Sequence, residues 1–123
     1  MAHYFERHGL EIIRFDCFGL EDDSDMARVD HASIIKATLE IDTPETQAFF
    51  LSCTAMQSVD VIAQIEKLTG KPVVTSNQAS AWAMANYARI KISEEKWGQL
   101  FNCSLPNVDI KHLKKSSIQN SPR

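Results

Sequence analysis

The chain has 123 residues, of which 44% are hydrophobic, and this length is typical of a single globular domain. Its three cysteines include no Cys-x-x-Cys pair, which argues against a disulfide framework and against a thiolate zinc site. No apolar run approaches the roughly 18 residues of a membrane span, and the N-terminus lacks a signal-peptide pattern, so we expect a cytoplasmic protein without a membrane partner.

The charge is divided unevenly along the chain. Residues 1–85 carry a net charge of −7 and residues 86–123 a net charge of +4, within a formal total of −3. The basic residues of the second part are sparse and cluster only at Lys111, Lys114 and Lys115. Because nucleic-acid-binding proteins present a denser basic patch, we expect no nucleic-acid partner.

The first predicted elements are a helix over residues 2–8, ended by Gly9, and a strand over residues 10–15. The strand is predicted from its apolar and partly alternating sequence. An acidic loop over residues 21–25 follows it. This loop lacks the ligand spacing and the central glycine of a calcium loop, so we expect a solvated loop rather than a metal site.

The middle of the chain predicts a helix, a strand and a second helix. Asp30 is in position to cap a helix over residues 31–41. The apolar run 48–51 stops at Ser52-Cys53-Thr54 and is typical of a central parallel strand that is buried on both faces. A helical pattern over residues 57–69 comes next.

Gly70 is a typical end for that helix, and residues 71–75 form a third predicted strand. A turn over residues 76–79 then leads into a further predicted helix over residues 81–85. Strands that alternate with helices indicate a parallel sheet with right-handed crossovers. We therefore predict an α/β fold, a three-layer parallel-sheet (Rossmann-like) single domain over residues 1–85. Residues 86–123 are expected to form a divergent C-terminal tail that is partly disordered.

The predicted strand ends bring polar side chains to one edge of the sheet. The carboxyl ends of parallel strands meet at the same edge, which is where α/β proteins bind ligands. Residues 17–23, Ser52-Cys53-Thr54 and Ser76-Asn77 are therefore expected to converge on one pocket.

Cys53 is the first candidate for chemistry at this edge. A thiol acts as an acid, a base or a nucleophile through its thiolate, and the N-terminus of a following helix favours an anion. Ser52, Thr54 and the backbone amides after Cys53 are suited to hold a substrate carboxylate or a developing enolate. The alternative is that Cys53 is simply a small buried residue, as free cysteines often are.

The remaining candidates have alternative interpretations. Cys17 lies between Phe15 and Phe18, so we expect it to pack in the core. Asn77 either orients a ligand or caps the helix that follows it. The sequence contains no P-loop, no Gly-x-Gly-x-x-Gly and no Ser-His-Asp order, and its histidines lack ligand spacing, so we expect neither a cofactor nor a metal.

Several of these segments together resemble the second half of the Asp/Glu racemase superfamily. Within it the resemblance is to the branch of maleate cis-trans isomerases, arylmalonate decarboxylases and ectoine-utilisation proteins. The segments that carry the resemblance are residues 7–11, 19–23, 27–29, 50–56, 65–66 and 70–79, with Trp82.

This resemblance implies one half of a two-domain racemase-type fold, with the active site between two similar domains, no cofactor and a small carboxylate as substrate. Cys53 matches the cysteine of the second half, which is an acid/base partner in the isomerases and racemases and the proton donor in the decarboxylases. Ser52, Thr54 and Asn77 match neighbours of that site and are implied substrate-binding residues. Asp23 stands near a position where some members bind substrate through Asn.

The first half of the family pattern, with its own cysteine, has no counterpart in this sequence, so we expect a truncated family member. One hypothesis is an isomerase or racemase of small dicarboxylates, similar to maleate isomerase, or an arylmalonate decarboxylase-like or ectoine-degradation protein. The other is a non-catalytic remnant that binds carboxylates. An active enzyme then needs a partner, either a second copy in a homo-oligomer or a separate first-half chain.

Overall fold

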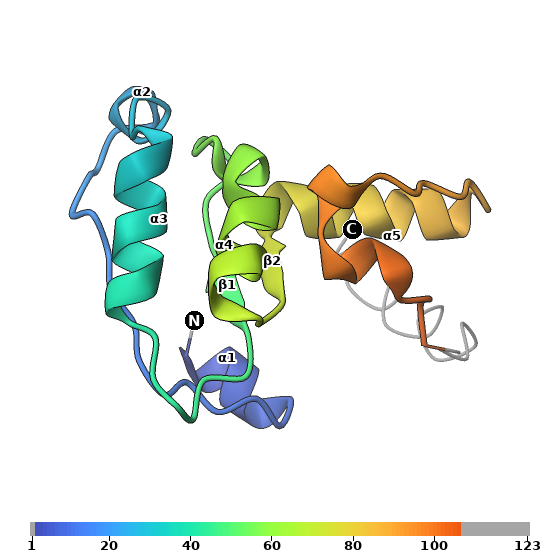
Figure 1. Ribbon diagram of the computed structural model, residues 1–123, viewed down its shortest axis with the longest axis horizontal. Helices are drawn as coiled ribbons and strands as arrows, with labels where there is room; N and C mark the ends of the chain where they lie inside the picture. Colours follow the sequence, from blue (N-terminus) through green and yellow to red (C-terminus); the bar gives the residue numbers. More distant parts are fainter. Residues whose placement is uncertain (1, 107–123) are drawn as a thin grey trace, which may run out of the picture.

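The computed structural model describes residues 2–106 of the chain (Figure 1). Its elements, in chain order, are α1 (Ala2–Arg7), α2 (Asp23–Met26), α3 (His31–Glu40), β1 (Phe49–Leu51), the 3-10 helix η1 (Ser58–Val61), α4 (Ile62–Thr69), β2 (Val73–Thr75), α5 (Ser76–Tyr87) and the 3-10 helices η2 (Glu95–Trp97) and η3 (Gln99–Asn102). No helix within this part of the chain is long and apolar enough to cross a membrane.

The two strands form a parallel sheet in which Phe49 pairs with Val73 and Leu51 pairs with Thr75. The connection between them passes through η1 and α4, as parallel strands require a crossover. The predicted α/β class is therefore confirmed. The helices predicted before and after each strand are also present, with bounds that differ by a few residues.

Helix α4 occupies the centre of the packing. Its side chains Ile62 and Ile65 are fully buried, and they form one core cluster with Ile34 of α3 and with Phe49 and Val73 of the sheet. Figure 1 shows α3 on one side of α4 and the η2 and η3 turns on the other, and α4 contacts α3, β2 and η2. The core therefore lies between one face of the sheet and the helices α3 and α4.

The strand predicted over residues 10–15 is wrong. These residues adopt no regular structure, and most of the segment from Gly9 to Asp22 runs past α3 on the side away from α4 (Figure 1). The Phe15 side chain is 79% exposed. An alternating apolar sequence forms a strand only where a neighbouring strand pairs with its backbone, and none of the described strands reaches this segment.

The expectation that β1 is buried on both faces is also wrong. Phe49 is 4% exposed on the face that meets α4, whereas Phe50 on the opposite face is 44% exposed. The ring of Phe5 from α1 packs edge-on against Phe50, with 5.3 Å between the ring centroids. One short helix thus covers only part of this face.

The ends of the helices follow from local chemistry. The Asp30 carboxylate accepts hydrogen bonds from the backbone amide and the hydroxyl of Ser33, and these bonds hold the pKa of Asp30 below its usual value. Gly70 ends α4 in the left-handed conformation with φ of 69°. Thr75 and Gln78 form a capping box at the start of α5.

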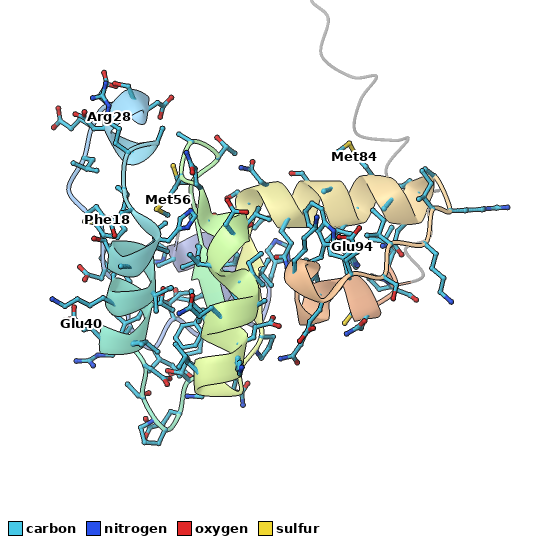
Figure 2. All side chains as sticks on the ribbon, turned by 45° about the horizontal axis from the view of Figure 1, so that its top comes forward. Phe18, Arg28, Glu40, Met56, Met84 and Glu94 are labelled. Carbon is cyan, nitrogen blue, oxygen red and sulfur yellow. The ribbon has the colours of Figure 1, made fainter. Side chains whose placement is uncertain are left out.

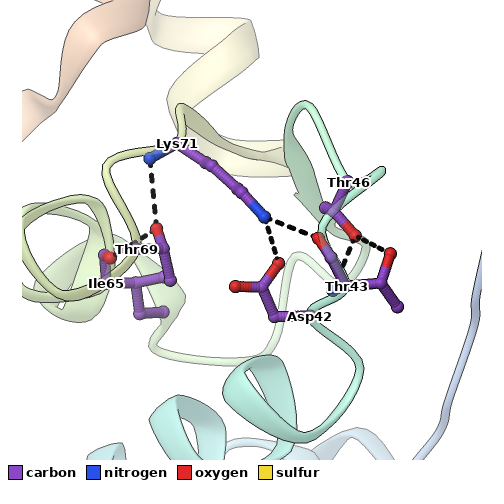
Figure 3. A network of polar contacts seen from close by, with 6 residues as sticks. All are labelled: Asp42, Thr43, Thr46, Ile65, Thr69 and Lys71. Atoms are coloured by element: carbon purple, nitrogen blue, oxygen red, sulfur yellow. Dashed lines mark hydrogen bonds and ion pairs between the residues drawn. The ribbon is translucent and has the colours of Figure 1, made fainter.

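Lys71 links the loop after α3 to the start of β2 (Figure 3). Its ammonium group donates to the Asp42 carboxylate and, at 2.8 Å, to the carbonyl of Thr43. Its backbone amide donates to the Thr69 hydroxyl, and that hydroxyl donates to the carbonyl of Ile65. The Lys71 and Asp42 side chains are only 21% and 26% exposed, so this ion pair is less screened by water than a surface pair.

We predict that Lys71→Met lowers the free energy of unfolding by about 1–2 kcal/mol, because two charge-assisted hydrogen bonds are lost and Asp42 is left without its partner. Urea denaturation measures the change. The matched control is Lys36→Met, since Lys36 is 77% exposed and lies 3.8 Å from Glu40. Equal midpoints for the two variants would contradict a stabilising role for the Lys71 network.

The segment after α5 packs on the same core. The backbone amides of Val73 and Gln99 both donate to the Glu66 carboxylate of α4, and Gln78 donates to the carbonyl of Trp97 at 2.6 Å. Helix α5 itself continues to Tyr87, beyond the domain end expected at residue 85. The disorder expected for the end of the tail concerns residues outside the described range.

Gly98 is required where this segment crosses α4. Its φ of 71° and ψ of −176° lie in a region that only glycine readily adopts. A Cβ atom at this position would overlap the Ile62 side chain and lie 2.9 Å from the Glu66 carboxylate. The backbone at Gly98 therefore lies directly against α4.

We predict that Gly98→Ala destabilises the fold more than Gly9→Ala does. Gly9 also has a positive φ, of 79°, but a Cβ there would meet nothing within 4 Å, so its replacement costs only about 1–2 kcal/mol of backbone strain. Thermal unfolding followed by circular dichroism compares the two variants. If the two variants lost the same amount of thermal stability, the close contact between Gly98 and α4 would contribute nothing to the effect.

Candidate functional site

The loop from Ser52 to Gln57 joins β1 to η1 at the carboxyl end of the sheet. Cys53 in this loop is partly buried and packs against the edge of the core cluster. Its Sγ atom lies 3.4 Å from Sδ of Met26, the last residue of α2. The thiol is therefore neither fully exposed, like Cys17 and Cys103, nor enclosed in the core.

The polar groups around Cys53 have unused hydrogen-bonding capacity. Within residues 2–106, no hydrogen bond is donated by the backbone amides of residues 53–57. The hydroxyl groups of Ser52 and Thr54, on exposed residues, also make no hydrogen bond to the described part of the chain. Consecutive free N–H groups next to hydroxyls are suited to hold a carboxylate.

Asn77 ties this loop to the start of α5. Its side-chain amide donates to the carbonyl of Thr54 at 2.9 Å. The hydrogen bonds that cap α5 come from Thr75 and Gln78, so the interpretation of Asn77 as the helix cap is wrong. The structure thus brings Asn77 to the loop of Ser52, Cys53 and Thr54, as expected for two of the three predicted strand ends.

Asp23 lies in the first turn of α2 and is exposed. Its carboxylate makes no hydrogen bond or ion pair in the described part of the chain, and α2 approaches the loop through Met26 and Ala27 instead. The neighbouring Asp22 accepts hydrogen bonds from the hydroxyl and the backbone amide of Ser24, which hold its pKa below the usual value. Asp22 therefore keeps its negative charge at neutral pH.

The expectation that Cys17 packs in the core is wrong. Cys17 is exposed, and its neighbours Phe15 and Phe18 are 79% and 43% exposed. Figure 2 shows Phe18 beside α3. Because the strand over residues 10–15 does not form, its end is not fixed at the sheet edge beside Cys53, and Cys17 does not contact Cys53 in this structure.

Two surface hollows of the described part of the chain lie between other elements than those around Cys53. One surface hollow lies between α3 and α4, where Ile35, Leu39 and Gln64 line it, and another lies between Glu66 and residues 92–102. Neither hollow includes Cys53. Among residues 2–106 there is also no group of three or more His, Cys, Asp or Glu side chains placed to hold a metal ion.

Sequence reasoning missed two residues at this site. Met26 contacts the thiol, and the side-chain amide of Gln57 lies 3.4 Å from the carbonyl of Ala27. Both contacts join segments about thirty residues apart. One feature of the sequence could have identified Met26. It is an apolar residue directly after an acidic stretch, and this pattern indicates that one side of the segment faces the protein.

Comparison with known proteins identifies the family. The family model described as arylmalonate decarboxylase matches residues 1–101. The chain is 32% identical over 85 residues to a maleate isomerase of Pseudomonas putida, covering 68% of this chain and 34% of that protein. It is 34% identical over 59 residues to an arylmalonate decarboxylase of Bordetella bronchiseptica, covering 46% of this chain and 25% of that protein.

Solved structures agree with these matches. A crystal structure of arylmalonate decarboxylase superposes with a TM-score of 0.72 at 26% identity, over 82% of this chain and 46% of that one. A glycine-to-cysteine mutant of arylmalonate decarboxylase in a sulfate-associated form gives a TM-score of 0.73 at 26% identity, over 83% and 45%. The chain thus spans less than half the length of these relatives. It belongs to the arylmalonate decarboxylase family, within the Asp/Glu racemase-like superfamily.

Proposed function

We propose that this chain carries one cysteine-bearing half, the second, of a cofactor-independent isomerase or racemase that acts on small carboxylates, similar to maleate isomerase. The observation that carries the proposal is the partly buried thiol of Cys53 beside free backbone amides and the free hydroxyls of Ser52 and Thr54. One relative, which is 32% identical over 85 residues, is a maleate isomerase. The resemblance of the Cys53 segment to the catalytic segment of this branch supports the same assignment.

In the proposed reaction, the Cys53 thiolate attacks one alkene carbon of the substrate. A C–S bond forms, the π bond breaks, and its electron pair moves onto the adjacent carbon and carboxylate as an enolate. The free amides of residues 53–57 stabilise this charge. Rotation about the new single bond and departure of the thiolate restore the double bond in the other geometry. For a racemisation, Cys53 instead moves a proton beside the carboxylate.

A decarboxylase-type reaction is the second candidate, because the family model and both solved structures are arylmalonate decarboxylases. In that reaction the carbanion left by departing CO₂ takes its proton from the Cys53 thiol. The same free amides hold the remaining carboxylate. Ser52, Thr54 and Asn77 have the same roles beside the thiol in both proposals, with Asn77 holding the loop through the carbonyl of Thr54.

The proposed site needs a second wall. The Cys53 loop lines neither of the two surface hollows described above, and the chain spans 46% of the arylmalonate decarboxylase structure. We propose that a second copy of this chain supplies the wall. The apolar side chains of Leu10, Ile13 and Phe15, together with the open face at Phe50, provide surface for such an association.

We predict that the protein converts maleate to fumarate, and that Cys53→Ser lowers the rate at least about 100-fold because the thiolate is lost. Proton NMR of the two acids measures the conversion. Cys103→Ser is the matched control, since Cys103 is exposed and its thiol donates to the carbonyl of Gln99 in its own segment. An arylmalonate is assayed in parallel for CO₂ release. A chain that turns over neither substrate would favour the non-catalytic carboxylate-binding alternative.

We predict that the chain self-associates in a concentration-dependent way, and that Phe15→Glu weakens the association by placing a charge in the apolar segment. Size-exclusion chromatography with light scattering measures the mass. Met84→Glu is the control, because Met84 is 66% exposed on α5, far from Phe18 (Figure 2). A monomer at every concentration would contradict completion of the site by a second copy.

A further inference from the structure

Met26 is the side chain through which α2 meets the rest of the protein. It is partly buried, whereas Asp23, Ser24 and Asp25 on the same short helix are exposed. Its Sδ atom is 3.4 Å from the Cys53 Sγ, within the range of an S–H···S contact. One direction of approach to the thiol is therefore occupied by a thioether rather than by solvent.

Few contacts hold α2 in this position. Besides the Met26 contact, one hydrogen bond within residues 2–106 joins this segment to a distant part of the chain. In it, the side-chain amide of Gln57 donates to the carbonyl of Ala27 at 3.4 Å. The other hydrogen bonds of this helix are local, including those between Asp22 and Ser24. The preceding residues 9–22 form no regular structure. A small segment with few long-range contacts opens at low cost.

The charges on α2 oppose a carboxylate near the closed thiol. Asp22, Asp23 and Asp25 lie within four residues of Met26, or about 6 Å along a helix axis, which is less than the Debye length of about 8 Å. Arg28 pairs with Asp25 at 3.1 Å, which leaves Asp22 and Asp23 uncompensated. While α2 is in this position, an anionic substrate therefore meets the Met26 side chain and a segment with net negative charge.

We propose that Met26 and α2 form a cover over Cys53 that moves away to admit a carboxylate to the thiol. This proposal rests on the proposed function only in naming a carboxylate as the substrate. The cover itself is a property of the folded chain, so it is tested by reaction of the thiol with small alkylating agents, without turnover. If the protein does not convert maleate, alkylation of the Cys53 thiol still tests the cover.

The test is peptide-resolved labelling of the wild-type protein with iodoacetamide at neutral pH. We expect Cys53 to react at least about fivefold more slowly than Cys17 and Cys103, and the three rates to converge in urea, because closure of the native fold causes the difference. Iodoacetate, which is an anion, should show a larger difference than iodoacetamide. Cys53 as the fastest of the three thiols in the native protein would overturn the proposal.

Variants of Met26 separate the cover from general loosening. Met26→Ala should raise the Cys53 rate at least about fivefold without changing the rates of Cys17 and Cys103. Met26→Leu, which keeps most of the side-chain volume, should react like the wild type. Thermal unfolding of each variant checks that the fold persists, and if Met26→Ala unfolds, the wild-type comparison decides. An unchanged Cys53 rate in folded Met26→Ala, or an equal rise in Met26→Leu, would overturn the cover.

Discussion

Burial of the apolar side of α4 is the constraint on which the other features depend. Ile62 and Ile65 are fully buried against the sheet and α3, and each isoleucine contributes about 1.5–3 kcal/mol of transfer free energy. This packing fixes α4 relative to β1 and β2. The loop of residues 52–57 connects β1 to the 3-10 helix η1, which leads directly into α4. The same packing therefore sets the position of Cys53.

The core lies on one face of a small sheet, and this has two consequences. The Phe50 side of β1 and the apolar side chains of residues 10–18 are left exposed. The Cys53 loop also lines neither of the two surface hollows described above. The chain spans 46% of the length of its solved relative, arylmalonate decarboxylase.

The candidate chemistry depends on contacts made by side chains outside the loop. Asn77 holds the carbonyl of Thr54, so the free amides of residues 53–57 belong to a loop that is fixed at one end by α5. Met26 occupies the space beside the thiol. Donors that are fixed in advance suit a reaction with a developing negative charge, because they need no reorganisation during the reaction.

The sequence by itself determined the elements that have local signals. Asp30 and Gly70 mark helix ends through hydrogen bonds and backbone conformations made within a few residues, and the apolar run of β1 placed Cys53 at a strand end. Only the tertiary structure decided whether residues 10–15 became a strand, because pairing depends on a neighbouring edge that no local pattern encodes. It also decided the Met26–Cys53 contact, since residues so far apart in sequence meet only after the helices pack around α4.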